Sequence, residues 1–279
     1  MVSVVVTVYN GESYIEKALQ SIIEQTRKPD EIVVIDDAST DRTRDIVLKS
    51  FAGKVVYHRN PTNRERCYSR NKGFSLSQGE YVFFMDYDDL WEEHHVETLL
   101  RLWGDAQIVY SFPRRLIDAT GKVIKRSSRS LPQDPCMAVF SGVVGYPSAT
   151  AFRRDYFLEY KDPYMVREDW EVFVRACLLG YRIKLVDTDT VMIREHSRRS
   201  SKSRRLYEGT KRVYEEYVNR LPEEYLPYFL FHVGDMAMRF GELREGWSLV
   251  LKAVAKKPSL LTSGRELLVL LKRGFRFWR

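Results

Sequence analysis

Three acidic clusters carry the residue types that metal-dependent and acid–base chemistry needs. They are Asp36-Asp37, Asp86-Tyr87-Asp88-Asp89 and Glu168-Asp169. The first two end apolar runs of strand length, and the third stands just before a predicted helix that begins near Trp170. In an open α/β sheet, ligands bind at the loops beyond the carboxyl ends of the strands. Carboxylates gathered there repel one another unless a cation or a hydrogen-bonding base lies among them.

The cluster from Asp86 to Asp89 has the spacing of a site for a divalent cation. In an extended segment, side chains at i and i+2 lie on the same side of the backbone. Two or three hard carboxylate oxygens suit Mg²⁺ or Mn²⁺, which take substrate phosphates as further ligands. A solvated acidic turn, or a cap for the following helix, is the alternative explanation. The apolar run Tyr81–Met85 directly before the cluster favours the metal site.

The elements that must position these clusters are predicted as short apolar strands that alternate with helices. The strands are expected at Val2–Val8, Glu31–Ile35, Lys54–His58 and Tyr81–Met85. The intervening segments are predicted as helices that start near Tyr14, Asp41 and Cys67. This alternation predicts a parallel sheet covered on both faces, an α/β architecture typical of nucleotide-binding proteins.

Beyond residue 105 the regular alternation ends. An amphipathic helix is predicted at Trp170–Leu179, and the strands around it are expected at 107–112, 122–124, Ala149–Phe152, Arg182–Val186 and Val191–Ile193. After Arg205 the strand pattern stops, and three helices are predicted at Leu206–Leu221, Pro222–Phe240 and Glu242–Val254. We therefore place a domain boundary near residue 205.

Six motifs, taken in order, resemble those of the family 2 glycosyltransferases of the GT-A fold. They are VSVVVTVYN, EIVVIDDASTD, SRNKG, GEYVFFMDYDD, REDWE and REHS, and they cover roughly residues 1–200. The resemblance implies a Rossmann-like mixed sheet sandwiched by helices in residues 1–205, with a nucleotide-binding half to about 105 and an acceptor half after it. Residues 206–279 would then form a small helical appendage with a basic amphipathic tail. Enzymes of this family are usually inverting, use nucleotide-diphosphate sugars, most often of UDP, and need Mn²⁺ or Mg²⁺.

The resemblance also implies a role for individual residues. It implies that the sugar nucleotide is bound by Thr7, Tyr9, Glu12, Asp37, Arg66, Arg70, Asn71 and Asp86. Within this set, Asp37 would accept the N3–H of uracil, and Asp86 would contact the ribose or the sugar. Arg70 matches the family's arginine beside the nucleotide, and Arg66 is the alternative residue for that role. The residues that match metal ligands are Asp88, Asp89 and His196, of which His196 could instead approach the pyrophosphate. Asp169 matches the general base, with Glu168 beside it.

An inverting transfer makes chemical demands that these residues can meet. One base must deprotonate the acceptor hydroxyl, and the charge that develops on the leaving UDP must be neutralised by a metal ion and basic side chains. The basic run 194–205 contains Arg198, Arg199, Lys202 and Arg204. We expect this run to form a lid over the diphosphate, with a solvated loop as the alternative.

The positive charge of the chain is concentrated near its C-terminus. The net charge is +7, from 45 Lys and Arg against 38 Asp and Glu, and residues 252–279 alone hold eight basic residues against one acid. Within 258–278, leucines at helical spacing precede basic and aromatic residues, the pattern of a helix that binds an anionic membrane surface. Packing on the appendage or on a second subunit, and nucleic-acid binding, are the alternatives.

Cysteine content and hydropathy indicate the cellular compartment in which the protein works. The cysteines Cys67, Cys136 and Cys177 are odd in number, far apart and without a CxxC pair, which predicts reduced thiols and argues against a disulfide scaffold. No apolar run approaches the ~20 residues that cross a bilayer, and no basic leader opens the chain. We expect a cytoplasmic protein, peripheral on the inner face of the cell membrane.

Taken together, the sequence predicts a metal-dependent, inverting hexosyltransferase for cell-envelope polysaccharide. It would move a sugar from a UDP-sugar to a hydroxyl of a glycan or lipid-linked acceptor. A sugar-nucleotide-binding protein or a nucleotidyltransferase of related fold is one alternative, although the segment 9–12 lacks the glycine- and lysine-rich phosphate loop that a nucleotidyltransferase needs. A nucleic-acid-binding protein that uses the basic segments is the other, although no nucleic-acid-binding module is recognisable. Donor sugar, linkage and oligomeric state stay open.

Overall fold

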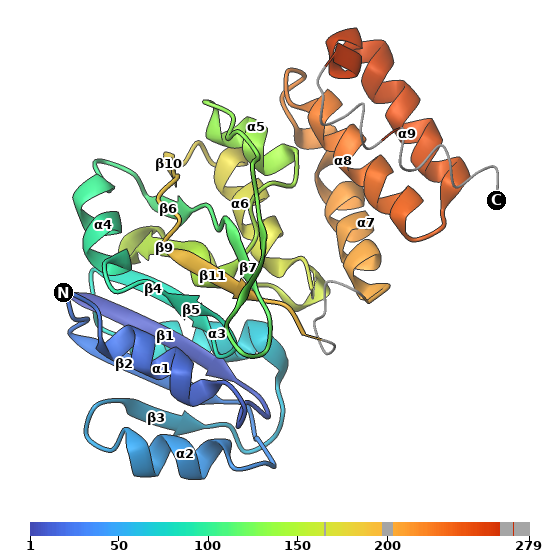
Figure 1. Cartoon of the computed structure of the whole chain (residues 1–279). Helices are drawn as coiled ribbons and strands as arrows, with labels where there is room; N and C mark the ends of the chain where they lie inside the picture. The colour runs from blue at the N-terminus through green and yellow to red at the C-terminus, as the bar shows by residue number, and fades with distance from the viewer. Residues whose placement is uncertain (165, 197–202, 263–269, 271–279) are drawn as a thin grey trace.

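A seven-stranded mixed sheet forms the centre of the computed structural model, which describes residues 1–164, 166–196, 203–262 and 270 (Figure 1). The strand order is β10-β6-β9-β4-β1-β2-β3. The strands are β1 (Val2–Val8), β2 (Glu31–Asp36), β3 (Val56–Arg59), β4 (Tyr81–Asp86), β6 (Ile108–Ser111), β9 (Thr150–Arg153) and β10 (Ile183–Val186). The strands β1 to β4 are mutually parallel, whereas β9 runs antiparallel between β4 and β6.

Local sequence explains the central strand β1. All seven of its residues are buried, because the helices α1 (Ile15–Ile23) and α3 (Glu65–Leu76) lie against the sheet on either side of it. A strand covered on both faces favours a continuous β-branched run over an alternating pattern, and the run of β1 is VSVVVTV. The prediction of Val2–Val8 as a buried parallel strand is thus confirmed.

A second, four-stranded sheet brings a distant segment over the end of the first. Its order is β5-β11-β7-β8, from β5 (Leu90–Trp91), β11 (Val191–Arg194), β7 (Arg115–Ile117) and β8 (Val123–Arg126). The strand β11 runs antiparallel to β5 and parallel to β7. Because β5 follows the cluster at Asp86–Asp89 directly, this pairing places the residues after β11 beside that cluster.

Helices complete the layers and form a separate group beyond Arg204. The remaining helices of the first part are α2 (Thr43–Ser50), α4 (His95–Leu102), α5 (Pro135–Phe140) and α6 (Glu168–Leu178). After them come α7 (Arg205–Tyr217), α8 (Leu226–Arg239) and α9 (Leu243–Lys256). Figure 1 shows these three together beside α5 and α6, at the end of the molecule away from β3 and α2.

The helical group shares its core with the first part of the chain. Trp170, which is completely buried on α6, stacks against Phe229 of α8 with ring centroids 5.5 Å apart. Within the group, α8 and α9 approach so closely that a Cβ on Gly234 would lie 2.8 Å from the Gly246 carbonyl oxygen. The helices predicted after residue 205 are therefore present, with α8 packed against α5 and α6 and α9 packed against α8. The division into domains at that residue stays our interpretation.

The prediction of three reduced cysteines is wrong for two of them. A disulfide joins Cys136 of α5 to Cys177 of α6, with their Cα atoms 5.8 Å apart, while Cys67 is free and buried. The two cysteines are 41 residues apart in sequence. Spacing could not indicate the pair, because only the packing of α5 against α6 brings them together.

The predicted lid and the predicted C-terminal tail fall largely on residues that the structure does not describe. Most of the predicted amphipathic tail, and Arg198, Arg199 and Lys202 of the predicted lid, lie outside the described residues. Among the residues that the structure does describe, none of the helices combines the length and the apolar character that crossing a membrane would take.

Candidate active site

The three acidic clusters line one pocket, as their positions in the sequence predict. The pocket has a volume of about 720 Å³, and its walls include Asp37, Asp86, Asp88, Asp89 and Asp169. Strand register explains the meeting of the first two clusters: Val8 lies opposite Asp36, and Thr7 lies opposite Asp86. The carboxyl end of β1 therefore stands between them, so that Thr7 and Tyr9 line the same pocket.

Asp37 is held in a fixed orientation at the end of β2. The residue is 5% exposed, and its Oδ1 accepts hydrogen bonds from Asn60 Nδ2 at 2.7 Å and from the Arg64 amide at 2.9 Å. The following residue, Ala38, has a φ of +64°, which is an uncommon conformation for a residue with a side chain. These contacts fix one carboxylate oxygen while the residue faces the pocket.

Two residues assigned to the sugar nucleotide have other partners and do not line the pocket. The Glu12 carboxylate pairs with Arg42 at 3.1 Å on the surface. The Asn71 side chain donates to the Tyr160 carbonyl and accepts from the Tyr160 amide, both at 2.9 Å. Asn71 thus joins α3 to the segment before α6. Contacts of Glu12 and Asn71 with a nucleotide stay predictions.

Arg70 connects two of the acidic clusters from inside the protein. Its side chain is 3% exposed, donates from Nη1 to Glu168 Oε1 at 2.7 Å and donates from Nη2 to Asp86 Oδ1 at 3.0 Å. Burial alone would lower the pKa of Arg70, but the Asp86 and Glu168 carboxylates hold it well above its ordinary value. Arg66, one turn earlier on α3, is more exposed, lines the pocket and lies 3.8 Å from Glu168.

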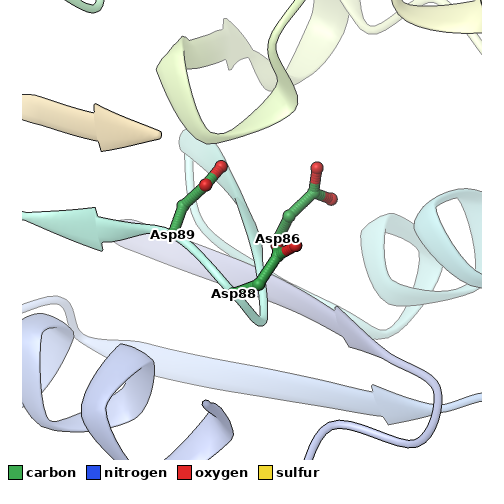
Figure 2. Close-up of side chains that lie close together, drawn as sticks. All are labelled: Asp86, Asp88 and Asp89. Carbon is green, nitrogen blue, oxygen red and sulfur yellow. The ribbon is translucent and has the colours of Figure 1, made fainter. Parts of the chain in front are cut away.

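The turn after β4 gathers three carboxylates in a way that fits a divalent cation. Figure 2 shows Asp86, Asp88 and Asp89 projecting from this one turn, and an oxygen of each lies within 4.8 Å of the others. Burial, with the negative charges of Asp88 and Asp86, raises the pKa of Asp89 well above its ordinary value. Hard oxygen donors so close together suit Mg²⁺ or Mn²⁺, and a cation among them would relieve this repulsion.

The members of this cluster differ in their protein contacts. Asp89 is 5% exposed, and its two oxygens accept from Ser148 Oγ at 2.6 Å and from the Arg194 amide at 2.8 Å. Asp88 Oδ2 lies 2.7 Å from His196 Nε2. The second sheet therefore brings His196 beside Asp88 and anchors Asp89 to β11. Contact of His196 with a metal ion or a pyrophosphate stays a prediction.

Asp169 stands in the first turn of α6 with the properties of a proton acceptor. Its Oδ1 accepts a hydrogen bond from the Trp170 amide at 2.7 Å. Burial raises the pKa of Asp169 to about 7, Glu168 adds to this shift, and Arg167 and Arg70 oppose it. Carboxyl groups with a pKa near the working pH serve as general bases.

Sequence reasoning missed two parts of the pocket wall. Lys125 lines it from β8, Arg114 and Arg129 line it from the segments just before β7 and after β8, and His232 and Arg239 line it from α8. No local pattern marks these residues, because their place in the wall depends on strand pairing and helix packing between distant segments.

Comparison with known proteins identifies relatives of the chain. A family model described as glycosyl transferase family 2 matches residues 3–161. WfaP of Escherichia coli, named a UDP-Glc:alpha-D-GlcNAc-diphosphoundecaprenol beta-1,3-glucosyltransferase, is 25% identical over 67% of this chain and 76% of its own length. Curated relatives at 30% and 35% identity match over 42% and 45% of their own lengths, so the chain spans less than half of them.

Two solved structures share the fold. Staphylococcus aureus TarS in complex with UDP-GlcNAc superposes with a TM-score of 0.66 at 20% identity, over 91% of this chain and 79% of that one. The mannosyltransferase PcManGT from Pyrobaculum calidifontis, in complex with GDP-Man and Mn²⁺, gives 0.59 at 18% identity, over 98% and 84%. At these identities the likeness shows the fold, which in the present chain is a central mixed sheet flanked by helices.

Proposed function

Because the chain belongs to glycosyltransferase family 2 and has the GT-A fold, we propose that it transfers a sugar from a UDP-sugar to an acceptor hydroxyl. One observation carries the proposal. Asp37, the Asp86–Asp89 turn and Asp169 line a single pocket, in which Asp169 has a pKa near 7. This arrangement supports a nucleotide site, a cation site and a general base in the same pocket.

The donor would lie across the carboxyl ends of β1 and β2. Asp37 is oriented through its Oδ1 by Asn60 and the Arg64 amide, so its other oxygen can accept the N3–H of uracil. Thr7 and Tyr9 would form the wall beside the base. The structure of TarS with UDP-GlcNAc supports a donor of this class.

A divalent cation would bind at the Asp86–Asp89 turn. We assign Asp88 as its main protein ligand, with His196 beside it, because both oxygens of Asp89 already accept hydrogen bonds. The Mn²⁺ in PcManGT supports Mn²⁺ or Mg²⁺ here. When bound, such an ion neutralises charge on the diphosphate leaving group. Arg66, which reaches the pocket from α3, would add a positive charge.

Asp169 would take the proton of the acceptor hydroxyl as that oxygen attacks the anomeric carbon. The bond from this carbon to the diphosphate oxygen breaks, and the negative charge leaves with UDP. A single base opposite the leaving group gives inversion. Arg70 is a positioning residue in this scheme, because it binds Asp86 and Glu168 at once and so fixes the base relative to the donor side.

The acceptor is proposed to be a glycan or a lipid-linked sugar of a cell-envelope polysaccharide. The name of WfaP, which includes a diphosphoundecaprenol acceptor, supports this class. Binding of residues 258–278 to the inner face of the membrane, and association into oligomers, stay predictions.

A thermal-shift screen of nucleotide sugars, with and without Mn²⁺, tests the proposal. UDP-sugars should raise the melting temperature more with Mn²⁺ than without it, and Asp37→Ala should weaken UDP binding about tenfold, the loss expected for one hydrogen bond to a charged group. Exposed Asp155 supplies the control variant Asp155→Ala, which should bind UDP like the natural chain. The proposal fails when no nucleotide sugar binds at any metal concentration.

A further inference from the structure

The wall of the pocket next to Asp169 carries positive charge from two parts of the chain. Arg167 precedes α6, and His232 and Arg239 belong to α8. The two α8 residues are seven positions apart, close to two helical turns, so they lie on one face of the helix. The charge comes from Arg167 and Arg239, and His232 accepts a hydrogen bond from Arg167. These three residues, which we call the cationic wall, are not explained by binding of the donor or of a divalent cation.

Arg167 is a buried cation without a carboxylate partner in the described part of the chain. Its side chain is 9% exposed, and its guanidinium lies over the Trp170 ring, 4.2 Å from the centroid. Nη2 donates to His232 Nε2 at 2.5 Å, whereas Nε is buried and has no hydrogen-bond partner. A buried polar group is costly unless it is hydrogen-bonded, and this side chain has an unused donor at Nε.

Packing holds the cationic wall in place. The His232 ring meets the Trp170 ring edge-on at 4.9 Å. On its other side lies Gly142, which has a φ of +64° and at which a Cβ would stand 2.1 Å from the His232 ring. Only glycine fits there without displacing the histidine. His232 is therefore fixed, and with it the orientation of Arg167.

The charge of the wall persists at neutral pH. Burial lowers the pKa of Arg167 to about 10, Asp169 opposes this shift, and the charge of Arg239 adds to it. Asp169, two residues after Arg167, lines the same pocket as Arg167 and Arg239, so the cationic wall lies beside the proposed base.

On this basis, and resting on the proposed function, we propose that Arg167 and Arg239 bind a phosphate group of the acceptor, with His232 orienting Arg167. Phosphate oxygens can accept from a guanidinium at two points, and this planar fork makes arginine the usual partner of phosphates at partly buried sites. Binding there would hold the phosphate next to the hydroxyl that gives its proton to Asp169. The acceptor would accordingly be a phosphate-bearing molecule, not a neutral glycan.

Calorimetric titration of the full chain in EDTA tests this site without its unidentified acceptor. The probes are inorganic phosphate, glycerol 3-phosphate and acetate. Both phosphates should saturate one site, with acetate much weaker. Arg167→Gln and Arg239→Gln should each weaken phosphate binding about tenfold or more, as expected for a lost charge-assisted hydrogen bond. Arg239 is exposed, so its variant tests the site even when Arg167→Gln does not fold.

Two matched controls locate the bound phosphate. Arg244→Gln removes an exposed arginine of α9 outside the pocket, and Arg66→Gln removes the arginine of the donor side. Neither should change phosphate binding. The inference is overturned when Arg66→Gln alone loses phosphate binding, or when both wall variants bind phosphate like the natural chain. It is also overturned when acetate binds as tightly as phosphate, or when the chain binds inorganic phosphate but not glycerol 3-phosphate.

Binding of UDP with Mn²⁺, measured on the same proteins, separates the two proposals. Failure of the natural chain to bind UDP rejects the proposed function. Intact UDP binding together with unchanged phosphate binding in the wall variants rejects only the phosphate site.

Discussion

Replacing Asp169 with asparagine should abolish sugar transfer and, at alkaline pH, make the protein more stable. The variant keeps the shape of the side chain, and its Oδ1 can still accept the hydrogen bond that the Trp170 amide donates at 2.7 Å. It loses only the charge and the ability to accept a proton. Stability and turnover should therefore change in opposite directions.

The magnitude follows from the pKa of Asp169. Burial, with the Glu168 charge, raises it from 3.8 to about 7 in the folded chain. Between these values the folded carboxyl keeps its proton while the unfolded one loses it, so stability falls as the pH rises through this range and the loss is complete above about 7. The full shift corresponds to about 4 kcal/mol. Because the side chain borders an open pocket, we expect solvent to reduce this to ~2 kcal/mol.

Urea unfolding of both proteins at pH values of about 5 and 8.5 measures this effect. Because part of the loss lies below pH 5, the natural chain should lose ~1 kcal/mol relative to Asp169→Asn between the two conditions. The control Asp155→Asn changes an exposed carboxylate and should follow the natural chain at both values. A difference between Asp169→Asn and the natural chain that does not vary with pH would refute the raised pKa, and with it the main reason for choosing Asp169 as the base.

Three further predictions concern the other parts of the site and the fold. Asp88→Ala should abolish the Mn²⁺-dependent part of UDP binding in a thermal-shift assay, and an unchanged metal effect would contradict its assignment as main ligand. Arg70→Met should lower the free energy of unfolding by ~3–5 kcal/mol, because it leaves buried Glu168 without its hydrogen-bonded partner. Arg66→Met should lower it by at most about 1 kcal/mol, since that arginine is partly exposed. Equal decreases in the two variants, measured by urea denaturation, would contradict the bridging role of Arg70. Reduction of the Cys136–Cys177 disulfide should cost ~4 kcal/mol for a loop of 41 residues, which unfolding with and without a reductant measures.

The parts of the fold that the sequence predicts are those with a local cause. The run VSVVVTV predicts a buried parallel strand, and β1 occupies Val2–Val8 as expected. The acidic pairs follow strands, and strand register then brings Asp37 and Asp86 to either side of the end of β1. Here the position of the acidic residues after apolar strands and the observed order of the strands indicate the same site.

Contacts between distant segments explain what sequence reasoning could not supply. Arg70 reaches Glu168, 98 residues away, and the Cys136–Cys177 pair depends on the packing of two helices. The strand β11 pairs with both β5 and β7, and no pattern within these short strands specifies the partners. His232 enters the pocket wall only because α8 packs against Trp170.

The packing of α8 on Trp170 has a thermodynamic consequence. The cationic wall takes Arg167 from one side of that contact and Arg239 from the other, so a phosphate bound by both contributes free energy to holding the helical group in place. Linkage requires the reverse as well: whatever strengthens the contact between α8 and the first part of the chain increases affinity for the phosphate. Substitutions in the Trp170–Phe229 stack, far from any reacting atom, should thus change the acceptor affinity and the melting temperature together.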